Sequence, residues 1–261
     1  MRVEFNPALL LTSKMQGIKF NNGINRASFG NNDGKDSFRI TSVDNFFNEG
    51  FIRAALKSNY GLTRVLKKYK LPENLNLKEL ENLKEHHLSD TQDICERIAD
   101  NLPYALKLNV NLTDLKKAAM LHDFGKVLIP PEILNKNGRL TPDEFKIMRL
   151  HSELGYQLLK NSGLNGNILY LIRNHHNNII GKNKFVYDID LQILNLADKY
   201  SALTEKRVYK PAMKPAHALT ILASEVKDGK VHPTVFNALV KAVNSNPFAG
   251  ITTVKYNTSI A

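Results

Sequence analysis

The sequence is poor in cysteine and has no long apolar run, and each absence excludes a class of protein. The single cysteine, Cys95, cannot form a disulfide within the chain, which favours an intracellular protein. Zinc modules built on several thiolates are excluded too, so any metal must be held by histidine and carboxylate side chains. No window approaches the roughly 18 consecutive apolar residues of a membrane span, and the apolar stretch at 7–11 is too short for a secretory signal. We therefore expect a cytoplasmic chain without a membrane span.

Strand signals are almost as scarce as cysteine. The chain has 261 residues, of which 43% are hydrophobic, enough for a sizeable core. No useful run alternates Val or Ile with polar residues, whereas apolar residues recur at helical spacing, as in Ile94, Ile98, Leu102 and Leu106. The pattern predicts an all-α protein whose helices pack as a bundle.

The same pattern divides the chain into four segments. Residues 1–43 are rich in Asn, Asp and Gly, which predicts a flexible leader. Residues 44–85 predict a helical extension, residues 86–243 the main helical domain, and residues 244–261 a loose tail.

Capping residues mark some of the predicted helix starts. Thr141 precedes Pro142 and stands three residues before Glu144, a pattern typical of a capping box. Thr113 has the place of a cap before Leu115. We expect one helix to begin at each of these threonines.

The formal net charge is +11, from 36 basic and 25 acidic residues. Such an excess of positive charge can bind nucleic acid, an anionic membrane surface or a phosphate-bearing ligand. It is spread evenly, because residues 1–85 carry +5 and residues 86–261 carry +6. The densest basic run, at 67–70, is typical of a solvated helix face, so the charge disfavours nucleic acid as the partner.

Two pairs of polar residues stand where apolar helical stretches end. One is His122-Asp123 and the other is His175-His176. A core helix rarely ends in such side chains unless something satisfies them. A His-Asp pair supplies a neutral nitrogen and a carboxylate that can bridge two ions, which suits Fe, Mn or Zn at a hydrolytic centre.

These residues resemble the HD superfamily of metal-dependent phosphohydrolases, and most closely its HD-GYP branch. The resemblance extends from about His87 to Val243 and is most specific between His122 and His151. The matching motifs are His122-Asp123-Phe124-Gly125-Lys126, His151-Ser152-Glu153-Leu154-Gly155, His175-His176, Ala197-Asp198-Lys199-Tyr200 and Arg207-Val208-Tyr209-Lys210.

The resemblance implies an all-α HD-domain helical bundle with a short helical N-terminal extension and two divalent transition-metal ions (Fe, Mn or Zn). A hydroxide between the ions would attack the phosphorus of the substrate. The implied ligands are His87, His122, Asp123 and Asp198 for one ion, and His151, His175, His176 and the same Asp123 as a bridge for the other. The implied catalytic residues are Asp123 and Lys126, and the implied phosphate-binding residues are Lys126, Arg207 and Lys210.

Two neighbouring histidines are candidates for the first ligand. His87 is followed at helical spacing by Ile94 and Ile98, as in the family, whereas His86 is followed by the residues of a solvent face. The pattern favours His87 and leaves His86 open. Some HD-GYP proteins bind a third ion through a Glu one turn earlier, but Leu83 stands there in this chain, so a third ion is not expected.

The chain departs from the family in its substrate region. The Gly-Tyr-Pro stretch after the His pair is missing, and the gap from His176 to Asp198 is shorter than in the family. Asn177 replaces a Glu and Ser201 replaces an Asp. Because the metal ligands are kept while this loop is not, we expect weaker selection for cyclic di-GMP, the branch's usual substrate.

The sequence therefore predicts a metal-dependent phosphohydrolase or phosphodiesterase that acts on a nucleotide or cyclic dinucleotide phosphoester. The expected partner is a phosphorylated small molecule, a nucleotide, and the sequence identifies no protein partner. Two alternatives stay open. One is a catalytically silent HD-GYP-like signalling module that binds a nucleotide or a protein, and the other is an RNA-binding or RNA-cleaving role suggested only by the net charge.

Overall fold

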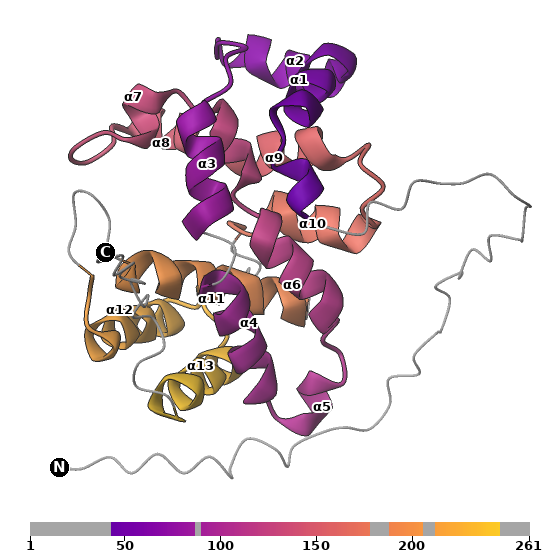
Figure 1. Cartoon of the computed structure of the whole chain (residues 1–261). Helices are drawn as coiled ribbons and strands as arrows, with labels where there is room; N and C mark the ends of the chain where they lie inside the picture. Colours follow the sequence, from indigo (N-terminus) through magenta and orange to yellow (C-terminus); the bar gives the residue numbers. More distant parts are fainter. Residues whose placement is uncertain (1–42, 87–89, 178–187, 206–211, 246–261) are drawn as a thin grey trace, which may run out of the picture. The chain divides into compact units, whose positions relative to one another are not determined.

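The computed structural model describes residues 43–86, 90–177, 188–205 and 212–245. Every regular element in these ranges is a helix, so the predicted all-α class is confirmed. The elements shown in Figure 1 are, in chain order, η2 (Val43–Phe46), α1 (Glu49–Ser58), α2 (Tyr60–Lys68), α3 (Leu77–His86), α4 (Asp90–Asp100), α5 (Tyr104–Lys107), α6 (Leu112–Leu121), η3 (Phe124–Leu128), α7 (Pro131–Leu134), α8 (Pro142–Met148), α9 (His151–Leu159), α10 (Gly166–Asn174), α11 (Ile189–Thr204), α12 (Pro215–Lys227) and α13 (Pro233–Ser245).

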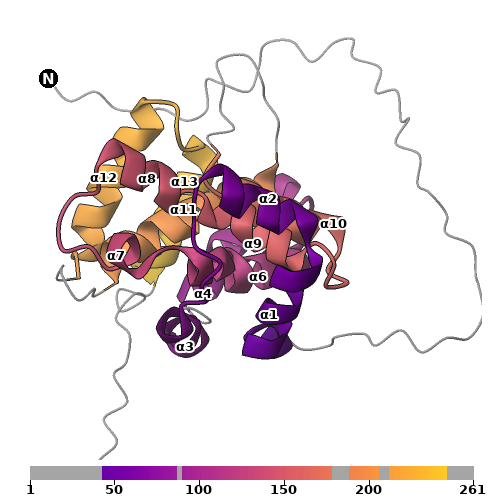
Figure 2. The ribbon, with the colours of Figure 1, turned by 90° about the horizontal axis from the view of Figure 1, so that it is seen from above.

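The core is built around α4, α6 and α11. Helix α6 contacts α4, α10 and α11, and α9 contacts α10 and η3; Figures 1 and 2 both show α4 and α6 side by side. The predicted apolar stripes face inward, with Ile98, Leu115 and Leu158 among the buried residues. Burying one such side chain stabilises the fold by about 1.5–3 kcal/mol.

The short helices that precede residue 70 pack onto this core. Both α1 and α2 contact α9, and η2 contacts α6. The predicted leader lies outside the described residues except for Val43, and the predicted tail except for 244–245. Within the described ranges, no helix combines the length and the apolar character that crossing a membrane requires.

The capping predictions had mixed outcomes. At Thr141 the capping box is confirmed, because its hydroxyl accepts the Glu144 N–H and the Glu144 carboxylate accepts the Thr141 N–H. At Thr113 the prediction is wrong. The cap of α6 lies two residues earlier, at Asn111, whose side chain accepts the N–H of Asp114 at 3.1 Å.

Polar side chains tie the N-terminal ends of α6, α10 and α11 together. Asn111 caps α6 and Asn165 caps α10, and each side-chain amide also donates to the buried carboxylate of Asp114 at 2.8 Å. Asn167 donates to the same carboxylate at 3.1 Å. Asp190, in the first turn of α11, accepts the backbone N–H of Asn111 at 3.2 Å. These three helices therefore start from one shared polar cluster.

The carboxyl of Asp190 is the group of this cluster most sensitive to pH. Burial raises the pKa of Asp190 to about 6, although the hydrogen bond from the Asn111 backbone opposes the shift. The folded state therefore holds this proton more tightly than the unfolded chain does. Ionising Asp190 costs folding free energy, and the cost appears as the pH rises from about 4 to about 6.

We predict that Asp190→Asn increases the free energy of unfolding by about 1–2 kcal/mol at pH 8 and has little effect at pH 4. Urea denaturation of the wild type and the variant at both pH values measures the difference. The matched control is Asp143→Asn, because the Asp143 side chain is 94% exposed and its replacement should change little at either pH. An equal effect of Asp190→Asn at pH 4 and pH 8 would contradict the argument.

Candidate metal centre

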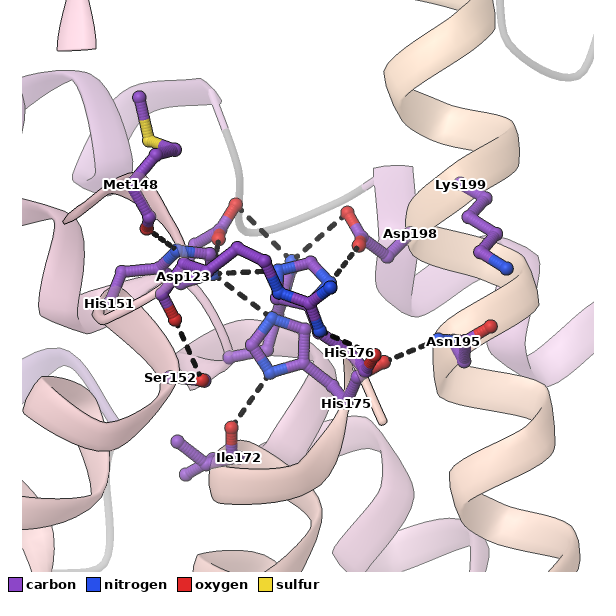
Figure 3. Close-up of polar contacts among 12 residues, drawn as sticks. Asp123, Met148, His151, Ser152, Ile172, His175, His176, Asn195, Asp198 and Lys199 are labelled. Atoms are coloured by element: carbon purple, nitrogen blue, oxygen red, sulfur yellow. Dashed lines mark hydrogen bonds and ion pairs between the residues drawn. The ribbon is translucent and has the colours of Figure 1, made fainter. Parts of the chain in front are cut away.

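Most of the predicted ligands lie where helices end or begin. His122 is the C-cap residue of α6, His175 is the C-cap residue of α10, and His151 is the first residue of α9. Asp123 follows directly in the turn between α6 and η3. Figure 3 shows Asp198 directed from its helix towards the histidines, whereas the neighbouring Lys199 points away from them.

Hydrogen bonds to the backbone orient three of the imidazole rings. The Nδ1 atoms of His122, His151 and His175 lie 2.7, 2.6 and 2.7 Å from the carbonyl oxygens of Ala119, Met148 and Ile172, each three residues earlier. A ring whose Nδ1 donates its proton in this way presents Nε2 as the ligand atom. The same hydrogen bond, to the carbonyl oxygen three residues earlier, therefore fixes the direction of Nε2 in all three rings.

The ligands form two groups whose donor atoms lie close together. The histidine group consists of His151, His175 and His176, and the aspartate group consists of His122, Asp123 and Asp198. Within each group the possible ligand atoms lie within 4.8 Å of one another. Nitrogen and carboxylate donors at this spacing suit first-row transition metals, so the side chains fit a metal centre.

The carboxylate of Asp123 lies between the two groups. Its Oδ1 is 3.2 Å from Nε2 of His151, and its Oδ2 is 3.3 Å from Nε2 of His122. Each oxygen therefore faces a ring of a different group, as a bridging ligand requires.

The two groups differ in charge. Burial lowers the pKa values of all three rings of the histidine group, that of His151 to about 4, so these rings are neutral and can donate a lone pair to a metal. Burial also opposes a charge on His122, but Asp123 and Asp198 outweigh it and raise the pKa of His122 to about 10.

The carboxylates of the aspartate group are ionised although Asp123 is buried and Asp198 is half-buried. Burial favours the neutral acid at Asp123, but Lys126 and His122 hold its pKa well below the usual range. Hydrogen bonding and charge from His122 likewise outweigh burial and lower the pKa of Asp198. Two ionised carboxylates in a buried place create a strong preference for positive charge.

Two side chains that the sequence analysis missed hold the backbone of the His pair. Asn195 donates to the carbonyl oxygen of His175 at 2.6 Å, and Arg149 donates to that of His176 at 2.8 Å. Asn195 stands three residues before Asp198 on α11, so its place on the same face of the helix could have signalled it. No sequence signal marked Arg149.

Two glycines allow η3 and α9 to meet through their backbones. A Cβ atom on Gly125 would overlap with the carbonyl oxygen of His151 and with the N–H of Gly155. A Cβ atom on Gly155 would lie 3.2 Å from the nitrogen of Gly125. A side chain at position 125 would therefore push Asp123 and His151 apart, which gives a physical reason for the glycine in each motif.

The family can now be stated. The model of a family described as an HD domain matches residues 74–235, more than half of the chain. The chain belongs to the HD domain family. The predicted resemblance to the HD superfamily is thereby confirmed.

Several curated relatives have informative names. A cyclic di-GMP phosphodiesterase of Pseudomonas aeruginosa is 31% identical over 141 residues, which cover 51% of this chain and 34% of that protein. A 3'3'-cGAMP-specific phosphodiesterase of Vibrio cholerae is 27% identical over 162 residues, covering 59% and 37%. A cyclic di-GMP phosphodiesterase of Thermotoga maritima is 32% identical over 177 residues, covering 63% and 46%. The matched part of the chain thus spans less than half the length of each relative.

Lys126 of this HD domain lies against the Asp123 carboxylate. Its Nζ atom is 2.6 Å from Oδ2 of Asp123, and its side chain is 15% exposed. Lys126 was predicted to reach a substrate phosphate, and its ammonium is directed instead at a predicted metal ligand. Its role towards the substrate stays a prediction.

Other predicted site residues lie outside the described residues. These are His87, Arg207, Lys210 and most of the shortened loop that follows Asn177. His86 is the last residue of α3, and His87 lies outside the described residues. The choice between the two as the first ligand therefore stays open. Leu83 is 2% exposed and belongs to the apolar core.

We predict that Gly125→Ala lowers the free energy of unfolding by about 2–3 kcal/mol, because a methyl group there meets fixed backbone atoms. Gly155→Ala is the matched contrast, since its methyl group would lie 3.2 Å from the nearest backbone atom, farther than at Gly125, and alanine favours the helix. Urea denaturation of both variants in the presence of a chelator measures packing without any contribution from metal. Equal stabilities for the two variants would show that the close contact at Gly125 is not needed.

Proposed function

We propose that this HD domain is a metal-dependent phosphodiesterase that hydrolyses a cyclic dinucleotide at a centre of two divalent ions. The observation that carries the proposal is the place of Asp123, with one oxygen 3.2 Å from His151 Nε2 and the other 3.3 Å from His122 Nε2. A carboxylate placed in this way can give one oxygen to each of two ions.

The two groups divide the ligands between the ions. The histidine group would hold one ion, and the aspartate group together with His87 would hold the other, with Asp123 shared. Mixed nitrogen and oxygen donors suit Fe, Mn or Zn. Ions bound there lower the pKa of a coordinated water and offset the negative charge of the phosphoryl oxygens.

Cationic side chains have the remaining roles. Lys126 orients the bridging carboxylate and places an ammonium at the edge of the centre, where it can also neutralise a phosphate oxygen. Arg207 and Lys210 are proposed to bind the more distant phosphate of the substrate, because guanidinium and ammonium groups form charge-assisted hydrogen bonds with phosphate.

The substrate class rests on the relatives rather than on the geometry. The relatives named above act, by their names, on cyclic di-GMP or on 3'3'-cGAMP, which share a ring of two phosphodiesters. A cyclic dinucleotide is therefore the substrate we propose for this chain. The two names differ in a base, so selection between bases is a separate question.

We predict that Asp123→Ala loses most of the bound metal and lowers turnover by at least about 10³-fold, because each ion loses a ligand. Lys126→Ala serves as the contrast. It should keep both ions and lose about 10²–10³-fold in turnover, since its ammonium acts on a carboxylate and a phosphate. Elemental analysis of the purified chains and hydrolysis of cyclic di-GMP with Mn²⁺ or Fe²⁺ supplied measure both quantities.

The same measurements separate the alternatives. Two ions and near-normal turnover in Asp123→Ala would show that the centre is assigned wrongly. A wild-type chain that binds cyclic di-GMP and two ions but hydrolyses no phosphodiester would be the silent signalling module. An affinity for RNA that falls steeply with salt would favour the RNA-binding role.

Selectivity is the subject of a second prediction. The loop after the His pair lacks Gly-Tyr-Pro, so contacts to phosphate should outweigh contacts to the guanine bases. We expect kcat/KM for a linear dinucleotide or an aryl phosphodiester to equal or exceed that for cyclic di-GMP at matched metal occupancy. A hundredfold preference for cyclic di-GMP, about 2.7 kcal/mol of differential transition-state binding, would contradict this expectation.

A further inference from the structure

The segment 43–71, which precedes the part matched by the HD domain model, contacts the metal-binding motif directly. Phe124 stands between Asp123 and Gly125 and is 1% exposed. Its ring meets that of Phe47 edge to face, with 5.3 Å between the centroids and 83° between the planes. The ring of Phe51 lies 6.5 Å from the same ring. One side of η3 is therefore held by aromatic side chains from outside the matched domain.

The same segment also holds α9. Asn59, between α1 and α2, is buried; its side-chain amide donates to the backbone carbonyl of Gln157 and its side-chain oxygen accepts the N–H of Leu62 at 3.1 Å. Gly61 brings α2 close to α9, because a Cβ atom there would overlap with the side-chain oxygen of Gln157 and lie 2.8 Å from Nζ of Lys160.

These two contacts act on the two elements that meet at the bridging ligand. Asp123 immediately precedes η3, and His151 begins α9. The separation of 3.2 Å between Asp123 Oδ1 and His151 Nε2 depends on how η3 and α9 lie against each other. Two contacts fix that packing. One is the close approach of Gly125 and Gly155 within the matched domain, and the other is the packing of segment 43–71 on η3 and α9.

We infer that segment 43–71 is a positioning element of the metal centre, with Phe47 and Asn59 as its positioning residues, and this inference rests on the proposed function. Phe47 fixes η3 through Phe124, and Asn59 fixes α9 through Gln157. Loosening either contact lets the Asp123 carboxylate move relative to His151, so a shared ion is bound more weakly. Neither residue touches a metal or the substrate.

Ordinary core packing offers a competing explanation, because a buried phenylalanine stabilises most folds. The two explanations differ in what a substitution changes. Loss of packing alone lowers the free energy of unfolding and leaves the metal affinity of the folded chain unaltered. Loss of positioning lowers the metal affinity even at a temperature where the chain is fully folded.

The experiment measures the dissociation constant of Mn²⁺ for the full chain by calorimetric titration, well below the unfolding temperature. The variants are Phe47→Ala, the conservative Phe47→Leu, and Asn59→Ala as a second route to the same effect. Leu222→Ala is the matched control, because Leu222 is 1% exposed on α12, which packs on α11 and α13. Circular dichroism reports that each variant is folded.

Phe47→Ala and Asn59→Ala should each weaken Mn²⁺ binding by about tenfold, as the loss of outer-shell support does at other metal sites. Phe47→Leu should recover most of the affinity, and Leu222→Ala should keep the wild-type value despite its lower stability. Wild-type affinity in both Phe47→Ala and Asn59→Ala, or an equal loss in Leu222→Ala, would overturn the inference. If Phe47→Ala does not fold, the comparison of Phe47→Leu and Asn59→Ala with the control decides. A wild-type chain that binds no Mn²⁺, Fe²⁺ or Zn²⁺ would overturn the proposed function and this inference with it, whereas unaltered binding in the variants overturns the inference alone.

Discussion

The shared start of three helices is the constraint on which the metal centre depends. Helices α6, α10 and α11 begin at the caps Asn111, Asn165 and Asp188. Asn111 and Asn165 both contact the carboxylate of Asp114, and α11 joins this cluster through Asp190. His122 lies 11 residues after the first cap, and His175 and Asp198 lie 10 residues after the second and third. At about 1.5 Å of rise per residue, the stretch from each cap to its ligand covers about 15–17 Å. Because these stretches are of matched length and leave one cluster, they bring their ligands to one depth.

Burying the ionisable side chains of the candidate centre costs folding free energy, which other contacts must offset. His122, His175 and Asp123 are 1%, 0% and 5% exposed, and buried ionisable groups destabilise a fold unless partners satisfy them. Lys126 and the protonated ring of His122 supply positive charge beside the carboxylates, and backbone carbonyls satisfy Nδ1 of three rings. A divalent cation bound at the same place would offset the charge of the carboxylates more strongly than these partners do, and its binding would stabilise the folded chain.

The sequence predicted the local features and missed those that depend on distant contacts. The polar pairs at helix ends and the capping box at Thr141 follow from neighbouring residues, and the structure has them. The cap of α6 was assigned to Thr113, because both threonine and asparagine can cap a helix. The contact of Asn111 with Asp190, 79 residues away, is a feature of the observed cap that neighbouring residues do not signal. The bond from Asn59 to Gln157 joins residues 98 apart. The periodicity of apolar residues does not predict a contact between such distant residues. The contacts that hold η3 and α9 in place therefore follow from the structure alone.

The side chains of the proposed ligands differ in how much of their surface is exposed to solvent. The side chains of His122 and His151 are 1% and 4% exposed, whereas those of Asp198 and His176 are 18% and 28% exposed. Among the proposed ligands in the described part of the chain, His176 and Asp198 are therefore the most open to solvent, whereas the segment 43–71 packs on η3 and α9. Under the proposed function, side chains that contact the substrate would lie next to these two ligands. The loop that follows the His pair begins next to His176 in sequence. Under the proposed function, a change in that loop would alter selectivity while the buried ligands, their backbone hydrogen bonds and their positions along the helices stay the same.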